Sequence, residues 1–173
     1  MEFRFLSAQD AGEWWRLRLE ALEGDPEAFS SSAEDHRSLS VRDVESRLGD
    51  GTTDSFVAGA FDADRLAGMA GFVREKGLKT RHKGRIWGVY VTPGRRGRGV
   101  GRKMLQMLLD RGATLGGIEM VLISVAATQE SAAGLYRSLG FELFGTEPRA
   151  LLVRGQYIDE QYMVLRLNPP AGV

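Results

Sequence analysis

The sequence predicts an α+β fold with one central sheet, in a single domain over residues 1–173. Two observations predict this fold. From residue 86 onward predicted strands are joined by predicted helices, and a segment that is apolar on both faces, Ile86 to Val91, leads through a Gly-rich turn into a helix. The composition, 43% hydrophobic and 27% charged residues, is that of a folded globular chain. We find no repeat, linker or internal domain boundary in the sequence.

The first half of the chain is expected to contain two helices and two strands. Ser7 and Asp10 have the spacing of a capping box, which predicts a helix that ends before Gly24-Asp25-Pro26. The other expected elements are a polar, Ser-rich loop over 26–39, a short helix from Ser40 that stops at Gly49-Asp50-Gly51, strands over 55–61 and 66–73, and a basic connection over 74–85.

The second half is expected to alternate strands and helices. The run Ile86 to Val91 is predicted to be a central strand, ended by Pro93. Apolar residues at helical spacing from Val100 predict a helix that reaches about Leu115. The remaining expected elements are a strand over 118–125, a helix over 130–139, strands over 141–145 and 157–167, and a tail led by Pro169-Pro170.

Charge and composition argue against several classes of function. Lys+Arg and Asp+Glu both number 23, so the formal net charge is zero, which disfavours a nucleic-acid or anionic-membrane binder. The chain has no cysteine and therefore no disulfide, thiolate metal site or cysteine nucleophile. His36 and His82 are far apart in the sequence, and no metal site is expected. Without a signal-peptide pattern or an apolar run of spanning length, we expect a cytoplasmic protein.

The Gly-rich turn after the central strand has the pattern of a phosphate-binding loop. Backbone amides at a helix start have no intrahelical acceptor and carry partial positive charge, so they bind anions. Gly97, Gly99 and Gly101 would let the backbone approach an anion without obstruction by side chains. The turn also holds five cations, at the helix end where the dipole disfavours them: Arg95, Arg96, Arg98, Arg102 and Lys103. A bound polyanion would offset that cost.

Neither of two common nucleotide-binding motifs fits this turn. The spacing Gly97-x-Gly99-x-Gly101 is not the dinucleotide fingerprint, because residue 102 is Arg, and no Gly-Lys-Ser/Thr follows to make a Walker loop. The alternative is a Gly-rich turn with a solvated basic helix start. That alternative explains the glycines poorly, because it requires no close approach of another group to the backbone.

Two motifs in this region resemble the GNAT superfamily of N-acetyltransferases. Arg96 to Gly101 matches the family pattern Q/R-x-x-G-x-G/A after a strand, and Gln129 to Phe141 is similar to N-x-x-A-x-x-L-Y-x-x-x-G-F. The motif core spans 86–141, and the order of elements extends the likeness over nearly the whole chain. The resemblance implies a mixed, mostly antiparallel sheet of six to seven strands flanked by about four helices, splayed between the strands near 86–91 and 118–125.

The resemblance implies an enzyme that moves an acetyl group from acetyl-CoA to a primary amine by direct attack in a ternary complex, without a metal. The diphosphate would sit on backbone amides of the Gly-rich turn, and the pantetheine arm would pair with the central strand. An amide of Val89 or Val91 would polarise the thioester carbonyl. The implied cofactor-binding residues are Val89, Tyr90, Val91, Arg96, Gly97, Arg98, Gly99, Val100, Gly101, Arg102, Gln129 and Tyr136.

Tyr136 matches the tyrosine that the family often uses as general acid. A phenol with a pKa near ~10 can hydrogen-bond to or protonate a thiolate whose conjugate acid has a pKa near ~8.5. The alternative from helical spacing is a core aromatic. Two positions depart from the family pattern. Gln129 replaces the usual Asn, for which we expect altered geometry and retained binding, and Trp87-Gly88 stand where many relatives carry a glutamate base.

The sequence leaves the general base and the acceptor open. The base candidates are Glu34, Asp35, His36 and His82, for each of which a solvated loop residue is the alternative. An acidic stretch from Glu23 to Asp35 would attract a cationic amine, and a basic run from Arg74 to Arg85 would meet an acidic acceptor or the 3′-phosphate of CoA. Both could equally be solvated surface. Trp14, Trp15 and Phe29 either line the acceptor pocket or belong to the core.

The expected partner is therefore a small-molecule or peptide amine, with neither nucleic acid nor membrane, and a homodimer fits the family. Two other functions compete with this interpretation. One is a non-catalytic acyl-CoA sensor on the same fold, favoured by Trp87 and by the lack of an obvious base. The other is a nucleic-acid binder that uses the arginine cluster, which the neutral net charge opposes.

Overall fold

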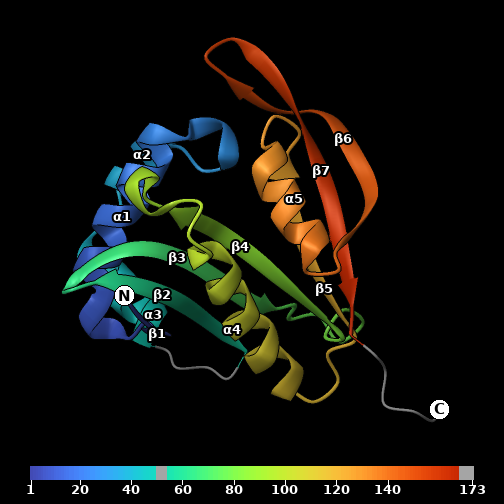
Figure 1. Cartoon of the computed structure of the whole chain (residues 1–173), viewed down its shortest axis with the longest axis horizontal. Helices are drawn as coiled ribbons and strands as arrows, with labels where there is room; N and C mark the ends of the chain where they lie inside the picture. Colours follow the sequence, from blue (N-terminus) through green and yellow to red (C-terminus); the bar gives the residue numbers. More distant parts are fainter. Residues whose placement is uncertain (50–53, 168–173) are drawn as a thin grey trace.

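The structure, a computed structural model, describes residues 1–49 and 54–167, which form one seven-stranded sheet with helices on both faces (Figure 1). The strands are β1 (Glu2–Phe5), β2 (Ser55–Asp62), β3 (Arg65–Arg74), β4 (Lys83–Val91), β5 (Met120–Ala126), β6 (Glu142–Val153) and β7 (Gln156–Arg166). The helices are α1 (Ala11–Gly24), α2 (Ala33–Arg37), α3 (Val41–Gly49), α4 (Val100–Thr114) and α5 (Glu130–Ser138). Short 3-10 turns lie at Ala8–Asp10, Pro26–Ala28 and Pro93–Arg95.

The sheet has two halves that separate along β4 and β5. The strand order is β1-β2-β3-β4-β5-β7-β6, and every neighbouring pair is antiparallel except β4 with β5. These two parallel strands pair only between Lys83–Arg85 and Met120–Leu122. Beyond that point the strands diverge, and α5 lies on the β5 side of the opening (Figure 1). The predicted mixed, mostly antiparallel and splayed sheet is therefore confirmed.

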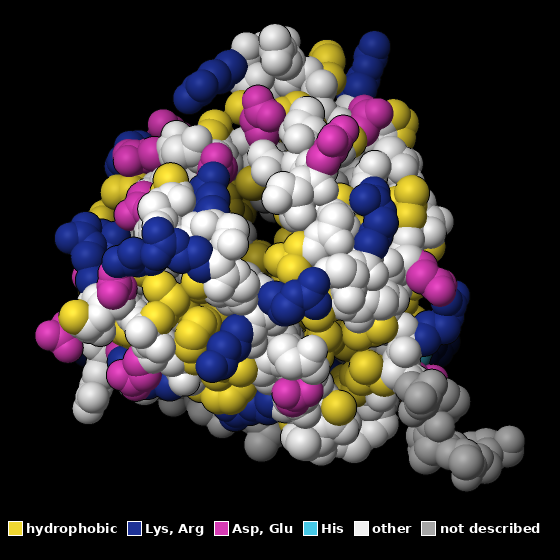
Figure 2. All heavy atoms as spheres, in the orientation of Figure 1, with side chains coloured by type: hydrophobic (Ala, Val, Ile, Leu, Met, Phe, Trp, Pro, Cys, Tyr) yellow, Lys and Arg dark blue, Asp and Glu magenta, His cyan; other side chains and the backbone are white. Residues whose placement is uncertain are grey.

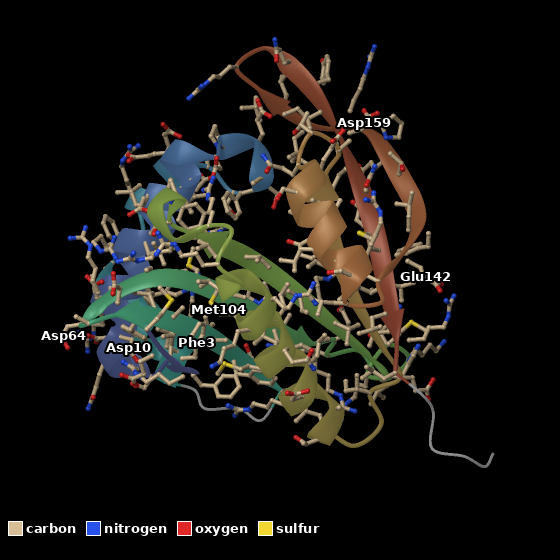
Figure 3. The ribbon with its side chains drawn as sticks, viewed as in Figure 1. Phe3, Asp10, Asp64, Met104, Glu142 and Asp159 are labelled. Atoms are coloured by element: carbon tan, nitrogen blue, oxygen red, sulfur yellow. The ribbon has the colours of Figure 1, made fainter. Side chains whose placement is uncertain are left out.

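An apolar cluster on each face of the sheet holds the helices in place. On one face α4 buries Met104 and Leu108 completely against a cluster that includes Phe72. Met104, labelled in Figure 3, lies between α4 and the sheet, since a Cβ added to Gly68 of β3 would lie 3.0 Å from its Cε. On the other face α1 packs on β3, with Leu17 fully buried. The 3.6-residue period of these helices thus supplies the two layers that cover the sheet.

A β-bulge interrupts β4 where it leaves β5. Gly88 and Val89 together stand opposite Ala70, because the flanking register pairs are Gly71 with Trp87 and Met69 with Tyr90. Gly88 has a φ of 64°, in the left-handed region that glycine adopts without steric cost. The bulge reverses the alternation of side chains along the strand. As a result Trp87 and Tyr90 both belong to the α1-side cluster, although three positions separate them.

The structure contains elements that the sequence analysis did not predict. The expected loop over 26–39 includes α2, which is capped by Ser32, whose Oγ accepts a hydrogen bond from the amide of Asp35 at 3.0 Å. The four-residue β1 is too short to give a pattern, and it forms by pairing with β2. β6 runs far beyond the expected 141–145, because it pairs with β7 in a long hairpin. The predicted stop at Asp50-Gly51 and the tail at Pro169-Pro170 lie outside the described residues.

Candidate active site

A cleft of about 790 Å³ opens where β4 and β5 diverge. Its walls are the β4 residues 85–91, the Gly-rich turn, the β5 residues 123–126 and the inner face of α5. Figure 2 shows the hollow at the centre of this face of the molecule, with Lys and Arg side chains beside it. The cleft brings the Gly-rich turn, the free edge of β4 and Tyr136 together, although they are separated in the sequence.

Backbone amides at one end of the cleft are arranged to receive an anion. Gly97 and Gly99 have φ values of 73° and 76°, and Gly99 is the N-cap residue of α4. Within the described residues, the amides of 97–99 donate no backbone hydrogen bond, and those of 100–102 lie in the first helical turn, where an intrahelical acceptor is lacking. Successive amides in such a turn form a concave anion-binding site. The residues present therefore fit a phosphate-bearing ligand.

The glycines of this turn are required for different reasons. A Cβ added to Gly97 or Gly99 would meet nothing within 4 Å, so the positive φ and not packing explains these two glycines. A Cβ on Gly101 would lie 3.3 Å from Cδ2 of Leu135. The nearby side chain of Leu135 therefore accounts for Gly101 without a ligand.

The basic side chains of the turn point to different parts of the molecule. Arg95 pairs with Asp62, Arg96 pairs with Asp25 at 2.5 Å, Arg102 donates to Oγ of Ser138 at 2.6 Å, and Nζ of Lys103 lies 4.5 Å from the ring centroid of Phe3. Arg98 is exposed and is not among the residues that line the cleft, whereas Arg96 and Arg102 are. The basic side chains therefore do not converge on one point, and the continuous feature of the turn is its row of backbone amides.

The free edge of β4 forms one wall of the cleft through Val89, Tyr90 and Val91. The hydroxyl of Tyr90 donates to Glu20 of α1 at 3.2 Å. Burial, together with the nearby Glu20 carboxylate, raises the pKa of Tyr90 to about 12. The side chain of Tyr90 therefore ties β4 to α1, and it is the backbone of this strand that is left to pair with a ligand.

Tyr136 lies on α5 and lines the cleft, although only 5% of its surface is exposed. Its ring packs against that of Phe141, with a centroid distance of 6.2 Å. Burial raises the pKa of Tyr136 well above its usual value, so the phenol stays protonated at neutral pH. Gln129, the N-cap residue of α5, lines the same cleft.

The four base candidates do not line this cleft within the part of the chain that the structure describes. Asp35 and His36 line a second cavity of about 940 Å³, which shares Arg18, Ser31 and Trp87 with the cleft. His36 is buried, its Nε2 donates to the carbonyl of Trp15 at 2.9 Å, and burial lowers its pKa. Glu34 is exposed, and His82 lies just before β4, where its carbonyl accepts from the amide of Glu119 at 2.8 Å.

Ion pairs join many charges of the acidic stretch and the basic run. The pairs are Glu23 with Arg37, Asp25 with Arg96, Glu34 with Arg37, Asp54 with Arg74 and Arg81, and Glu75 with Arg85. Charges that are paired at the surface create little field for a distant ligand. The solvated-surface interpretation therefore fits both segments better than an acceptor-attracting one. Phe29 lines the cleft, Trp14 lines the second cavity, and Nε1 of Trp15 donates to the carbonyl of Leu39 at 2.8 Å.

The polar residues of the cleft that the sequence analysis missed include Arg18, Glu160 and Tyr162. Glu160 and Tyr162 come from β7, which the strand order places beside β5. Tyr162 donates to Glu147 at 2.5 Å, and this bond to a carboxylate raises its pKa to about 12. No local pattern distinguishes these residues, because an inward-facing polar residue and a solvent-facing one have the same periodicity in a sequence.

Within the described ranges, no helix is long and apolar enough to cross a bilayer. In the same residues, no group of three or more histidine and acidic side chains is placed to hold a metal ion.

Solved acetyltransferases have this same fold. A GNAT-family acetyltransferase from Streptococcus pneumoniae superposes with a TM-score of 0.87 at 20% identity, over 96% of this chain and 99% of that one. A phosphinothricin acetyltransferase from Sinorhizobium meliloti, solved in complex with acetyl-CoA, gives 0.83 at 22% identity, over 99% of this chain and 94% of that one. The class defined by the fold is therefore that of the GNAT-type α+β proteins.

The sequence assigns the chain within that class. The profile of the acetyltransferase (GNAT) family matches residues 14–141, and the chain belongs to this family. An L-methionine sulfoximine/L-methionine sulfone acetyltransferase from Pseudomonas aeruginosa is 35% identical over 81 residues, 47% of this chain and 46% of that protein. The chain spans about half the length of the curated relatives of this kind that it matches. The resemblance noted from the two motifs is confirmed.

Proposed function

We propose that the chain is an N-acetyltransferase that moves the acetyl group of acetyl-CoA to a primary amine by direct attack in a ternary complex. The observation that carries this proposal is the single cleft that joins the unpartnered amides of 97–102 to the free edge of β4 and to Tyr136. Membership of the family and a relative named as an acetyltransferase of amino-acid analogues support it.

In this proposal acetyl-CoA lies along the cleft from α4 to the bulge in β4. The diphosphate binds the amides of the Gly-rich turn, where the helix dipole adds to the attraction. The pantetheine arm pairs with the β4 edge as an added strand. The proposed cofactor-binding residues are Val89, Tyr90, Val91, Arg96, Gly97, Arg98, Gly99, Val100, Gly101, Arg102, Gln129 and Tyr136. Arg98, which does not line the cleft, is proposed to take part through its backbone amide.

The transfer forms a C–N bond and breaks a C–S bond. The amine nitrogen attacks the thioester carbonyl carbon, CoA leaves as a thiolate, and the amine gives up a proton. We assign Tyr136 to donate to the thiolate, because burial keeps its phenol protonated. An amide of Val89 or Val91 polarises the carbonyl. The chain has no cysteine to carry the acetyl group, so direct attack replaces a thioester-linked intermediate.

The proton of the amine passes through water to a carboxylate of the cleft. Asp25 and Glu160 are the acidic residues that line the cleft in the described part of the chain. Asp25 is paired with Arg96 at 2.5 Å, which favours Glu160 for this role. A cytoplasmic location and a homodimer remain predictions.

A screen of amines for release of CoA thiol from acetyl-CoA tests the proposed function. We expect acetylation of at least one primary amine, and calorimetric binding of acetyl-CoA much tighter than that of S-acetylpantetheine, which lacks the diphosphate. Tight binding without acetylation of any amine would favour the non-catalytic acyl-CoA sensor. The presence of Trp87 in place of a β4 carboxylate supports that alternative. Equal affinity for the two thioesters would contradict the role of the Gly-rich turn.

A further inference from the structure

Two buried hydrogen-bond donors on α1 have no partner among the described residues: Nε1 of Trp14 and Nη1 of Arg18. Both side chains are more than nine-tenths buried, with 6% and 8% of their surface exposed. Residues four apart on a helix lie on the same side of it, one above the other. The two residues therefore lie on the same side of α1, and both line the second cavity.

Arg18 is unusual because a buried guanidinium is costly unless an anion accompanies it. The side chain of Arg18 forms no ion pair and no hydrogen bond with another residue among 1–49 and 54–167. Its guanidinium carbon lies 4.5 Å from the ring centroid of Phe29, a contact that does not satisfy the N–H groups. Burial lowers the pKa of Arg18 to about 10, which leaves it charged at neutral pH. An anionic ligand that reached Arg18 would therefore stabilise a buried charge whose Nη1 has no partner among the described residues.

The position of Arg18 separates this ligand from the diphosphate of CoA. Nη1 of Arg18 lies 3.6 Å from the position of a Cβ built on Gly88, at the bulge of β4. Strand geometry places Gly88 about 10 Å before the end of β4 at Val91, and the Gly-rich turn lies beyond that end. The anion that meets Arg18 is therefore not the one that the Gly-rich turn receives.

Arg18 lies where the cleft meets the second cavity, since it lines both, as does Trp87. Trp14 lines the second cavity, and its indole packs edge-on against Trp87 with a centroid distance of 6.4 Å. Arg74 and Arg81, which also line the second cavity, pair with Asp54. Among the described residues that line both cavities, Arg18 is the charged one.

We propose that Arg18, with Trp14 as a second donor, binds the carboxylate of the acceptor, so that the acceptor is a small amine with a free carboxylate, of the amino-acid type. This inference rests on the proposed function. It places the amino group of the acceptor near Gly88, on the side of its carboxylate that faces the cleft. The guanidinium donates to the carboxylate oxygens, and the indole N–H donates from the same side of α1. The surrounding aromatic rings receive the apolar part of the acceptor.

The test compares three forms of each acceptor. L-methionine and L-phenylalanine are assayed beside their carboxamides and beside the amines that lack the carboxyl group, in wild type, Arg18→Gln and Trp14→Phe. We expect kcat/KM for the amino acid to exceed that for the carboxamide by about 10- to 100-fold in wild type. Arg18→Gln should abolish this preference and Trp14→Phe should reduce it. The exposed Arg42, which lines neither cavity, supplies the control Arg42→Gln with an unchanged ratio.

Thermal unfolding without ligand supplies a second, independent measurement. Because the charge of Arg18 is buried without an anion, Arg18→Met should be at least as stable as wild type. A marked loss of stability would make Arg18 a structural residue and overturn the proposal. A wild-type enzyme that acetylates carboxamides, dipeptides or plain amines as well as amino acids would overturn it too, while leaving the acetyltransferase function intact.

If no amine is acetylated at all, binding replaces turnover as the measurement. Calorimetry with L-methionine and its carboxamide, in the presence of CoA, should then show binding of the amino acid that Arg18→Gln removes. Absence of such binding would overturn the carboxylate site. Failure of acetyl-CoA itself to bind would instead reject the proposed function.

Discussion

Trp87 occupies the space that a side chain on Gly71 would need. The two residues are directly opposite on β4 and β3, and a Cβ added to Gly71 would lie 2.3 Å from Cε2 of the indole. A Cβ added to Gly84, which is opposite Arg74, would likewise lie 2.3 Å from Cζ of the neighbouring Phe72. Some of the 22 glycines of the chain therefore make room for aromatic rings on the sheet and have no role in binding phosphate.

Gly71→Ala should displace Trp87 and destabilise the protein. Overpacking of this kind costs about 1–3 kcal/mol, measured as the free energy of unfolding in denaturant. Since Trp87 lines both the cleft and the second cavity, KM for the acceptor should also rise. Gly145→Ala is the matched control, because a Cβ there meets nothing within 4 Å. Equal stability of the two variants would show that the indole moves aside without cost.

Gly99→Ala should weaken binding of acetyl-CoA beyond its effect on stability. Its φ of 76° makes any side chain strained by about 1–2 kcal/mol, and the new Cβ would stand beside the amides of the turn. Gly155, in the β6–β7 turn, has a φ of 81° and equally open surroundings, but it does not line the cleft. Gly155→Ala should thus lose similar stability and keep its affinity in calorimetry. The same affinity in both variants would argue against the Gly-rich turn as the diphosphate site.

Tyr136→Phe should lower kcat by about 100-fold or more while the protein remains folded. The raised pKa of Tyr136 means that its proton is retained throughout the range from pH 6 to 9, so wild-type kcat should show no alkaline fall from this residue. Tyr157→Phe is the control, since that residue is 59% exposed on β7. An alkaline limb below pH 9 that disappears in Tyr136→Phe would contradict the assigned environment of the phenol.

Asp10→Asn should destabilise the protein at neutral pH and not in acid. The Asp10 carboxylate accepts from both Nη atoms of Arg4, at 2.8 and 2.7 Å, and from the amide of Ser7 at 2.8 Å. The bonds from Arg4 are the largest cause of its lowered pKa, so the stabilisation is present above the unfolded pKa of about 3.9 and is lost as the pH falls through the folded value. At pH 7 the loss should be about 2 kcal/mol.

Denaturant unfolding of wild type and Asp10→Asn from pH 7 down to pH 2 measures this dependence. Asp64, exposed in the β2–β3 turn and labelled with Asp10 in Figure 3, gives the control Asp64→Asn with no such dependence. A stability difference between wild type and Asp10→Asn that persists unchanged at pH 2 would show that the charge of Asp10 is not what stabilises the structure.

Local signals were enough to predict the Gly-rich turn and most of the elements around it. Gly97, Gly99 and the helix that follows form a continuous motif, and hydrophobic periods define α1, α4 and α5 without knowledge of the fold. The position of Tyr136 in its motif predicted a residue of the cleft wall. Each of these features involves residues that are close together in the sequence, so the sequence alone is enough to predict them.

Tertiary structure alone decided which polar groups meet in the cleft. Glu160 lines the cleft because β7 lies beside β5 in the sheet. The arginines of the turn point in different directions because Arg95, Arg96 and Arg102 each bind a different partner elsewhere in the chain. The bulge at Gly88 places Trp87 and Tyr90 on one face, against the alternation that the sequence predicts. The missing partner of Arg18 is likewise invisible in a helical pattern, because an unsatisfied donor is defined by what packs around it and not by its neighbours along the chain.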